Sequence, residues 1–587
     1  MRQGEHFCPK DRLRVSRNSR AGLVLHNDSL LRLHENSSVR FSAPTEKGNT
    51  FLELLIGIGH FISRLRQPFL VNTPFINAYI EGTEFTVESG PDGARVTVLE
   101  GQVVARNKQG EVIVNSGQRA DSRPGEAPRG EVVVNPRDAV QWAFYYPPVV
   151  EPPAQHASEA VSRSLAAYGR GDLYGAFNAL AEEPGVTEAP DLLIYRSSLH
   201  LQVGGMAAAR RDLAAALKLR PEQTDALALM SLIATANNEH RQAVDLARRA
   251  LSADAQSASA YLALSYAQQA RFQLPEAREA AKQATVAAPD NALAWSRLAQ
   301  LELMFRNLQA STEAASRAVD IAPGHAQSLT TLGFARLIQF DLEGAREAFE
   351  QATSLDQAAP LPRLGLGLVR IRKGDVAEGR RQLEIAANLD PGNALIRSYL
   401  GKAYYEEKRD TLAATQFTLA KEFDDLDPTA WFYDAIRKQA GNRPIEALKD
   451  IQTSIDLNDN RAVYRSRLLL DQDEAARGAS QARIYQELGF EQLARTEAYK
   501  SLQSSTYNHS AHRLLADSYT GQPRYEKARL SELLQSQLLQ PLNTTPIQPQ
   551  LAVSNLGILD GAGPSAGGFS EYTPLFTREG LNLQLNA

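Results

Sequence analysis

The chain has 587 residues, more than a single hydrophobic core serves, so it is expected to fold as several domains. Its formal net charge of −5 argues against a nucleic-acid-binding protein, which needs a clustered basic surface. The only cysteine, Cys8, excludes an internal disulfide bond.

Residues 1–134 are expected to form an all-β domain. Segments 21–26 and 29–34 flank a polar turn and indicate a hairpin. Segments 83–88 and 94–100 alternate apolar and polar residues around a Ser-Gly-Pro-Asp-Gly turn, which is typical of a half-buried antiparallel pair. Further strands are indicated at 38–42, 102–106 and 111–115. Many short strands at close spacing predict a β-sandwich or β-roll.

The most apolar stretch of the chain is residues 51–62. It is shorter than the about 20 residues that a membrane-spanning helix needs, and it contains Glu53 and His60. We expect instead two buried strands that meet near residues 57–59. Residues 1–23 are polar and basic, without the apolar stretch of a secretory signal peptide.

Four motifs follow one another in this region: Val71-Asn-Thr-Pro74, Ile80-Glu-Gly-Thr-Glu-Phe-Thr-Val87, Val96-Thr-Val-Leu-Glu-Gly-Gln-Val103 and Asn115-Ser-Gly-Gln118. Together they resemble the FecR-type domain. The resemblance implies a periplasmic β domain, in a family whose founding members relay a signal from an outer-membrane receptor to a sigma factor. This chain differs from those regulators because neither a cytoplasmic helical segment nor a transmembrane helix precedes the motifs. Opening strands of the domain are also missing before Arg12, so we expect the chain to start downstream of its natural N-terminus.

Residues 135–157 are expected to link the β domain to a helical part. Residues 121–130 are typical of a loop by composition. The stretch that follows, residues 135–148, is aromatic and bounded by prolines. One interpretation is a segment that docks the β domain against the first helical repeat. The other is an exposed partner site, since exposed aromatic clusters mark interfaces.

A period of 34 residues organises the chain from about Leu193 to Phe423. Alanine recurs at this spacing: Ala216, Ala250, Ala284, Ala318, Ala352, Ala386 and Ala420. A second column, 15 residues further on, holds only small residues: Ser231, Ser265, Ala299, Gly333, Gly367 and Gly401. A fixed period of this length predicts a solenoid of helical hairpins, with small residues where two helices cross closely.

These columns resemble the tetratricopeptide repeat (TPR). Trp295, Leu298 and Ala299 match its first-helix motif, and Phe349 with Ala352 matches its second. The resemblance implies an all-α solenoid, a right-handed superhelix, which we place at residues 158–540. It also implies that the first helix of each pair lines the concave face.

Towards the C-terminus the repeat becomes irregular. The register survives one step after Phe423, and residues 476–540 are expected to form helices that cap the solenoid. Residues 541–587 are expected to be a linker followed by a strand-like tail. The tail alternates apolar and polar residues and resembles the junction with an outer-membrane barrel in bacterial FecR/TPR proteins, so the chain is expected to end before the rest of a barrel. A solvated extension is the alternative.

The sequence contains no motif typical of a catalytic or metal-binding site. It lacks a phosphate-binding loop, a zinc-protease motif, a nucleophile elbow and a cysteine pair. His509 and His512 have no carboxylate motif beside them, and residues 471–478 lack the glycine and glutamate of a calcium loop. We therefore expect no enzyme, no cofactor and no metal site.

The concave face of the solenoid is the expected binding surface. Its inward first-helix positions are Leu232, Leu262, Tyr266, Gln269, Gln300, Thr330, Phe334, Leu368, Lys402 and Tyr405. Tyr266, Phe334 and Tyr405 are the expected contacts, since aromatic residues dominate binding hot spots. The family's carboxylate clamp needs regular basic residues here and only Lys402 fits, so acidic C-terminal peptides are not expected ligands.

The sequence therefore predicts a non-enzymatic scaffold that binds a protein or peptide, in the bacterial periplasm or associated with the outer membrane. No nucleic acid is expected as a partner. Two alternatives stay open. One is a FecR-type signal-transducing regulator, and the other is the periplasmic part of an export assembly linked to a barrel.

Overall fold

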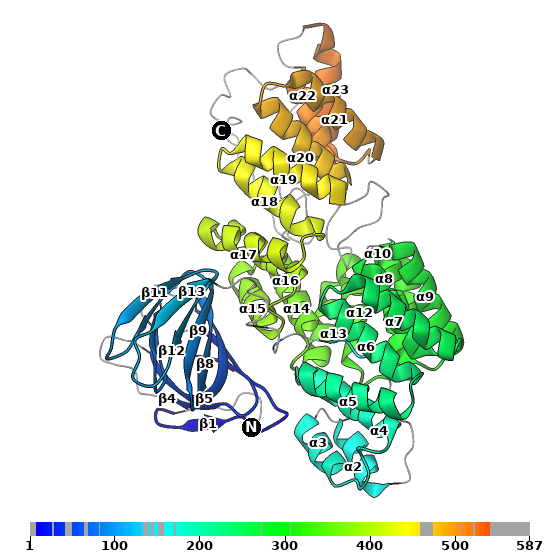
Figure 1. Cartoon of the computed structure of the whole chain (residues 1–587). Helices are drawn as coiled ribbons and strands as arrows, with labels where there is room; N and C mark the ends of the chain where they lie inside the picture. Colours follow the sequence, from blue (N-terminus) through cyan, green and yellow to red (C-terminus); the bar gives the residue numbers. More distant parts are fainter. Residues whose placement is uncertain are drawn as a thin grey trace.

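The computed structural model describes residues 8–539, apart from 26–28, 42–49, 64–68, 81–82, 133–139, 141–142, 144–145, 151–157, 169–171, 272, 306, 458–473, 505 and 520–522. These residues form a β domain followed by a long run of paired helices (Figure 1). The predicted fold class, an all-β domain joined to an all-α solenoid, is confirmed.

The β domain is built from short strands around one long strand. The described strands are β1 (Arg12–Arg14), β2 (Ala21–Val24), β3 (Leu30–Leu33), β4 (Ser38–Phe41), β5 (Thr50–Ile62), β6 (Phe69–Asn72), β7 (Asn77–Ile80), β8 (Glu84–Gly90), β9 (Gly93–Glu100), β10 (Gln102–Arg106), β11 (Glu111–Asn115), β12 (Gln118–Ser122) and β13 (Arg129–Val132). Their main order is β11-β10-β7-β6-β5-β8-β9-β12-β13. The predicted antiparallel pairs β2–β3 and β8–β9 are present, and the predicted strands β10 and β11 pair in the same way.

Strand β5 holds the β domain together. Its first half pairs with β4 and β6, and its second half pairs with β3 and β8. The prediction of two strands in residues 51–62 was wrong, because β5 runs unbroken through Gly57. Gly57 has φ +107, and a Cβ there would lie 2.5 Å from the Cβ of Ser37. Glycine lets the strand bend here and pass between the two halves of the sheet.

The expected loop at residues 121–130 was also partly wrong. Strand β12 continues to Ser122 and strand β13 begins at Arg129, with Gln118 paired to Val132 and Asp121 to Arg129. All four residues of β13 are exposed. Because the strand buries no face, no apolar pattern marks it in the sequence. Backbone hydrogen bonding to β12 makes this edge strand, which composition does not reveal.

The remainder of the described chain is helical. The helices are α2 (Glu159–Tyr168), α3 (Leu173–Ala181), α4 (Pro190–Gln202), α5 (Met206–Leu219), α6 (Thr224–Ala236), α7 (His240–Ala253), α8 (Ala258–Ala270), α9 (Leu274–Ala287), α10 (Ala292–Met304), α11 (Leu308–Ile321), α12 (Ala326–Ile338), α13 (Leu342–Leu355), α14 (Pro360–Arg372), α15 (Val376–Leu389), α16 (Ala394–Glu406), α17 (Asp410–Phe423), α18 (Pro428–Ala440), α19 (Pro444–Leu457), α20 (Glu474–Glu487), α21 (Glu491–Ser504), α22 (His509–Ser518), η2 (Pro523–Tyr525) and α23 (Glu526–Leu539). The first helices from α6 to α18 begin at 34-residue intervals, which confirms the predicted period.

The predicted columns of small residues lie at helix crossings. The column from Ala216 to Ala420 is fully buried. A Cβ on Gly401 of α16 would lie 2.7 Å from the ring of Phe417 on α17. Gly401 belongs to the second column of small residues. Where this second column holds serine, the hydroxyl donates to a carbonyl of the facing helix, as Ser231 Oγ does to the Ala243 carbonyl at 2.7 Å. Small residues are needed because the two axes approach closely.

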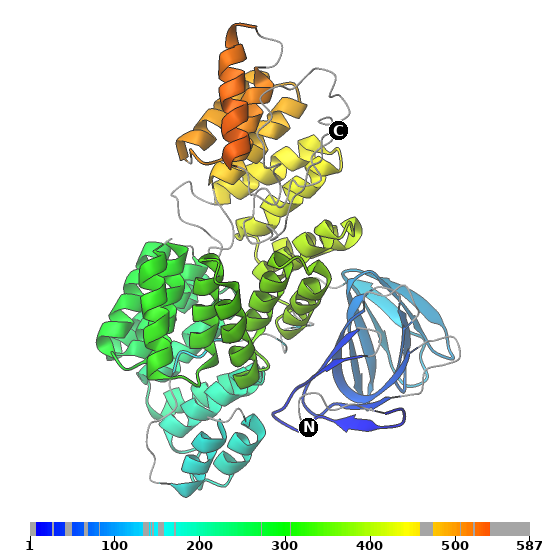
Figure 2. The same cartoon turned by 180° about the vertical axis from the view of Figure 1, so that it is seen from behind.

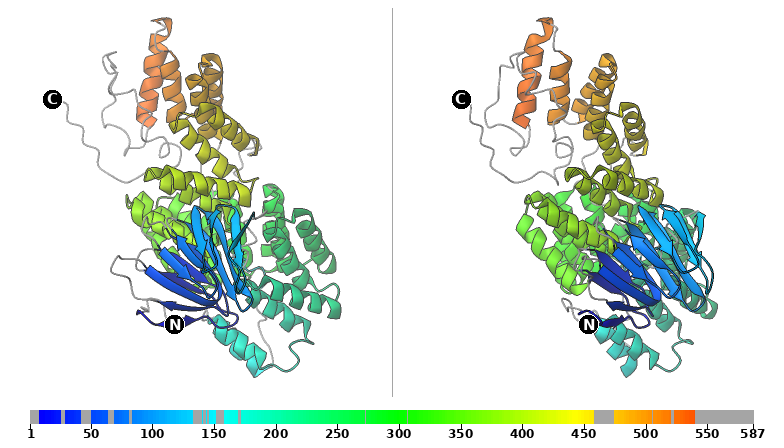
Figure 3. Two further views of the ribbon diagram at one scale, coloured as in Figure 1. Left: turned by 60° about the vertical axis from the view of Figure 1, so that its left-hand side comes forward. Right: turned by 90° about the vertical axis from the view of Figure 1, so that its left-hand side faces the viewer.

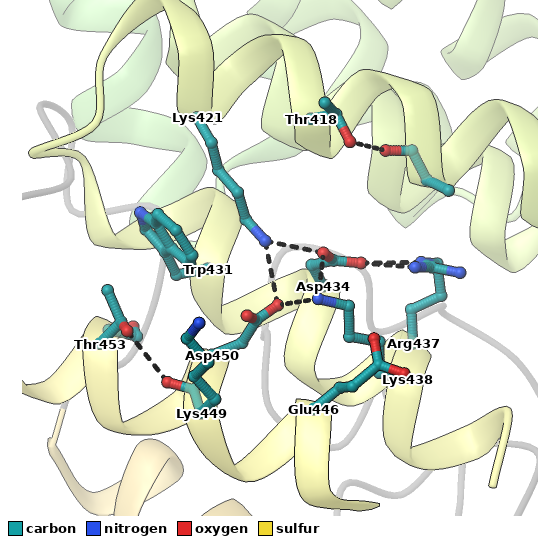
Figure 4. A network of polar contacts seen from close by, with 12 residues as sticks. Thr418, Lys421, Trp431, Asp434, Arg437, Lys438, Glu446, Lys449, Asp450 and Thr453 are labelled. Carbon is teal, nitrogen blue, oxygen red and sulfur yellow. Dashed lines mark hydrogen bonds and ion pairs between the residues drawn. The ribbon is translucent and has the colours of Figure 1, made fainter. Parts of the chain in front are cut away.

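Repeat α18/α19 is tied to α17 by a network of charged side chains (Figure 4). Lys421 Nζ donates to Asp434 at 2.7 Å and to Asp450 at 2.9 Å, and Lys438 donates to Asp450 at 2.6 Å. Burial alone would raise the pKa of Asp434, but Lys421, Arg437 and Lys438 hold it down at about 2. Asp434 is therefore ionised at neutral pH, and the network joins three helices through satisfied charges.

The β domain lies beside the middle of the solenoid (Figures 1 and 2). Strands β3 and β5 contact α15, although about 300 residues separate them in the sequence. The side views show the β strands in front of the middle repeats (Figure 3). The chain therefore leaves the β domain, builds several repeats, and returns to it.

Candidate protein-binding groove

A cavity of about 240 Å³ lies on the inner face of the solenoid, the surface formed by the first helices α6 to α16. Each of these helices contributes to the wall. The main lining residues are Leu232, Thr235, Tyr266, Gln269, Arg297, Gln300, Gln327, Thr330, Leu361, Asn393 and Leu395. The wall therefore combines apolar side chains with amide groups.

Tyr266 and Arg297 form a pre-arranged pair in this wall. The guanidinium of Arg297 lies 3.8 Å from the centre of the Tyr266 ring, and Arg297 Nε donates to Ser265 Oγ at 2.9 Å. Gln327 Nε2 donates to the Tyr266 hydroxyl at 3.1 Å. The arginine is thus engaged by the protein itself, through a cation–π contact and hydrogen bonds. Its role here is to orient the tyrosine ring.

Five of the ten residues predicted for the concave face line the cavity: Leu232, Tyr266, Gln269, Gln300 and Thr330. These five are therefore brought together from α6, α8, α10 and α12. They span four successive repeats, as expected of a groove that follows the superhelix.

The other five predicted residues lie outside the cavity wall. Leu262, Phe334 and Leu368 are fully buried in the core between helices. Lys402 is also fully buried, 5.2 Å from the ring centre of Tyr433 and 3.7 Å from Glu406. Tyr405 is half-buried, with the ammonium of Lys408 5.5 Å from its ring centre. Side chains that pack against a neighbouring helix, as Phe334 does against Phe349 of α13 and Lys402 beside Tyr433 of α18, do not line the cavity.

Some residues that line the cavity were not predicted, although the 34-residue period of the sequence points to them. Gln327, Leu361 and Leu395 all line the cavity and are spaced by 34 residues. The same period that revealed the repeat therefore identifies this second inward column.

The described residues of the linker, 140, 143 and 146–150, lie along the inner face. Val140, Ala143, Tyr146 and Val149 are buried, and Tyr146 also lines the cavity. The docking interpretation fits these residues, but the contact extends over several repeats and not only the first one. The aromatic residues 142, 144 and 145 lie outside the described residues.

The superhelix turns far enough to bring distant repeats together around this linker. Leu419 and Phe423 of α17 share an apolar cluster with Leu232 of α6. Asn238 Nδ2, just after α6, donates to the Phe423 carbonyl at 3.5 Å. The cavity is therefore bounded by both ends of this turn of the solenoid.

A buried ion pair fastens the β domain to the solenoid. Arg397 of α16 makes two bonds of 2.6 Å to the Glu84 carboxylate of β8, and both side chains are fully buried. His60 Nε2 donates to Glu84 at 2.9 Å, and His60 Nδ1 accepts from Asn388 Nδ2 at 3.2 Å. Burial lowers the pKa of His60, so this imidazole is neutral and bridges both domains. Gln416 Nε2 adds a bond of 2.8 Å to Glu100.

Arg32 of β3 joins three parts of the chain. Its Nη1 donates to the Ala143 carbonyl of the linker at 3.0 Å and to the Asn388 carbonyl at 3.0 Å, and it also contacts the Leu389 carbonyl. The last two carbonyls belong to the C-terminal end of α15, where the helix dipole favours a cation. Burial lowers the pKa of Arg32 to about 10, so it stays charged at neutral pH.

The described residues offer no metal site of the usual kind. Among them, no group of three or more His, Cys, Asp or Glu side chains could hold a metal ion. Within the same part of the chain, no helix is both long and apolar enough to cross a membrane.

Comparison with known families agrees with both resemblances. The FecR protein family model matches residues 11–104, and a tetratricopeptide repeat model matches residues 261–326 and 364–430. Both are families of non-catalytic interaction or regulatory domains. No curated protein matches the chain. The resemblance of the tail to a barrel junction stays a prediction, because residues 540–587 lie outside the described part.

Several solved structures are similar to parts of the chain. The APC/C hetero-tetramer Cut9–Hcn1 has a TM-score of 0.43 at 13% identity, covering 65% of this chain and 86% of that one. A putative anti-sigma factor from Parabacteroides distasonis has a TM-score of 0.22 at 13% identity, covering 29% of this chain and 75% of that one. A thermophilic TPR protein of Thermus thermophilus has a TM-score of 0.28 at 18% identity, covering 31% of this chain and 99% of that one. The family models and the architecture thus agree on an N-terminal FecR-like β domain followed by a helical solenoid that contains tetratricopeptide-like repeats.

Proposed function

We propose that the chain is a non-enzymatic scaffold of the bacterial periplasm whose solenoid binds a segment of another protein in the inner-face cavity. The observation that carries this proposal is the composition of the cavity wall. Tyr266 offers an oriented aromatic ring, and Gln269 and Gln300 line the wall with amide groups. These amides each keep further bonding capacity beside their bonds to Met304, Arg297 and Thr331. Amide side chains both donate and accept, as a peptide backbone does, and aromatic rings supply most of the binding energy of interfaces.

The cellular setting is inferred from the β domain. FecR domains are typical of bacterial envelope regulators. The match over residues 11–104 therefore supports an envelope location, and the periplasm is the compartment that we propose. Association with the outer membrane is part of the same proposal.

Site-specific crosslinking tests the binding site. A photo-reactive phenylalanine analogue at position 266 should capture one defined protein in cells, because this ring lies in the cavity. The matched control places the same analogue at Tyr174, an exposed tyrosine of α3 outside the cavity wall. Adding Gln300→Lys to the 266 variant should abolish the adduct, since it places an unmatched charge in the wall. Equal capture at both positions, or none at 266, would contradict the proposal.

A second candidate is a FecR-type regulator that passes a signal from the β domain to the solenoid. The fully buried Glu84–Arg397 pair favours it, because this contact makes the position of one domain depend on the other. A sigma-factor gene beside the gene for this chain, with target transcription changed by Arg397→Met, would support this role. Unchanged transcription would exclude it.

A further inference from the structure

Part of the inner face is already filled by the chain's own linker. Tyr146 and Val149 are buried in one apolar cluster with Leu232 of α6, Leu262 of α8 and Phe423 of α17. Tyr146 also forms part of the cavity wall. Residues 146–150, here called the internal segment, therefore lie on the surface that a partner would use.

The β domain holds the linker in this place from the outside. Leu99 of β9 belongs to the same apolar cluster as Tyr146 and Val149. Arg32 of β3 donates both to the Ala143 carbonyl, three residues before the internal segment, and to the end of α15. Residues of the β domain and of the solenoid therefore both lie next to the internal segment or to the residues just before it.

The chemistry of the internal segment matches the surface beneath it. Its sequence is Tyr-Pro-Pro-Val-Val, without a charged side chain. Two prolines keep such a segment extended at little cost in conformational entropy. The charged groups of the wall have partners within the protein: Arg297 bonds Ser265, Asp390 accepts from Asn393 Nδ2 at 3.1 Å, and Asp424 accepts from the Leu426 amide at 3.3 Å. The surface therefore suits an uncharged, extended segment with aromatic and proline residues.

We propose that residues 146–150 are an internal occupant of the groove, and that the external partner is an extended, uncharged segment with aromatic and proline residues that displaces them. This inference rests on the proposed function, because it names the kind of segment that the inner face binds. Displacement of the internal segment loosens the β domain, since Arg32 and Leu99 hold both. Linkage makes this effect reciprocal. If partner binding favours undocking of the β domain by some factor, undocking raises the affinity for the partner by the same factor.

A peptide-binding experiment on the full chain tests this inference. The probe is a fluorescent, end-blocked peptide with the sequence of residues 143–150, and its affinity is measured by anisotropy. The Tyr146→Ala/Val149→Ala variant should bind the probe at least tenfold more tightly than the unaltered chain, because its own segment no longer competes. The matched control is Tyr174→Ala/Val286→Ala, which makes the same changes at exposed positions and should bind as the unaltered chain does.

A second variant tests the role of the β domain. Arg32→Lys keeps the charge but removes the guanidinium Nη1 that donates to the Ala143 and Asn388 carbonyls, so it should raise probe affinity severalfold. It should also increase hydrogen–deuterium exchange in residues 146–150. A probe in which both tyrosines are replaced by glutamate should not bind any variant.

The outcomes separate this inference from the proposed function. Equal probe affinity for the unaltered chain and the Tyr146→Ala/Val149→Ala variant overturns the internal occupant. If position 266 still captures a partner in that case, the proposed function stands alone. If the double variant binds the probe tightly but position 266 captures no partner, the internal occupant stands and the proposed function fails.

Discussion

Arg397, Glu84 and His60 are fully buried although all three can carry a charge. Such groups are tolerated only when each one has a partner, because an unpaired charge in a protein interior is strongly unfavourable. Here the partners come from two domains, and Glu84 and Arg397 are 313 residues apart in sequence. The interface is therefore specified by a few polar side chains and not by apolar area alone.

Replacing Arg397 with methionine should destabilise the chain by about 3–5 kcal/mol, because it leaves the buried Glu84 carboxylate without its cation. The urea midpoint of unfolding measures this loss. The double variant Glu84→Gln/Arg397→Met should recover part of it, since both charges are then gone. Arg381→Met, at a largely exposed position of α15, is the control and should change little. Equal losses in the two single arginine variants would rule out a special role for the buried pair.

Stability should also fall as the pH drops from about 6.5 to 4. Burial lowers the pKa of His34, His200 and His325 to about 4 each, and it lowers that of His60 as well. Histidines in the unfolded chain keep a pKa of about 6.5, so the unfolded state binds more protons in this window and gains free energy. Thermal midpoints at several pH values measure the effect. His325→Gln should make the decline shallower, and an identical decline would show that this histidine does not contribute.

At the scale of single elements, the helices depend on the small residues at their crossings. Gly367 of α14 and Gly379 of α15 face each other so closely that a Cβ on Gly379 would lie 2.7 Å from the Gly367 carbonyl oxygen. The same Cβ would lie 2.4 Å from Ile371 Cγ1. Neither backbone can move without separating the two helices.

Gly379→Ala should therefore lower the free energy of unfolding by about 1–3 kcal/mol, the usual effect of overfilling a packed core. Gly324→Ala is the matched control, because no heavy atom lies within 4 Å of the added Cβ and the backbone there is not in the left-handed region. Thermal or urea melts compare the two. Similar stabilities for both variants would mean that the crossing tolerates a larger residue.

The elements themselves follow from local patterns, with informative exceptions. The 34-residue period predicted the first helices of successive repeats, because small and apolar residues must recur wherever equivalent helices pack. Strand β5 was expected as two strands because its glycines resemble a break. Only its neighbours reveal why it continues: Ser37 takes the space of the missing Cβ, and strands on both sides supply hydrogen bonds.

At the scale of the whole molecule, the β domain and the middle repeats form one interface around the linker. Glu84, Glu100 and Arg32 all reach the solenoid within α15 to α17. The β domain has its own buried core, which is separate from that of the helices. Undocking is therefore possible without unfolding either part.

Glu84→Arg should undock the β domain, because it sets two guanidinium groups against each other at a buried position. Small-angle scattering should then show a larger radius of gyration, while circular dichroism keeps the signal of folded strands and helices. The charge swap Glu84→Arg/Arg397→Glu should restore the compact form. An unchanged radius in the single variant would show that apolar contacts alone hold the domains together.

Only half of the residues that the sequence predicted for the groove line the cavity. The period places Tyr266, Gln269 and Gln300 on inward positions, and they do line the cavity. It places Phe334 and Lys402 inward as well, yet both are fully buried: Phe334 packs against Phe349 of α13, and Lys402 lies beside Tyr433 of α18. Helix periodicity predicts which side chains point inward. The curvature of the superhelix decides whether another helix covers those side chains.

By itself, the sequence determined the two domain types, the paired helices and their spacing, because these depend on contacts between residues close in the chain. Only the tertiary structure decided that α17 returns to α6, that Tyr146 of the linker lies in the cavity wall, and that Arg397 pairs with Glu84. Those contacts join residues that are from about 80 to more than 300 positions apart. Small rotations between repeats add up along a solenoid, so the meeting point of distant segments is a property of the whole molecule.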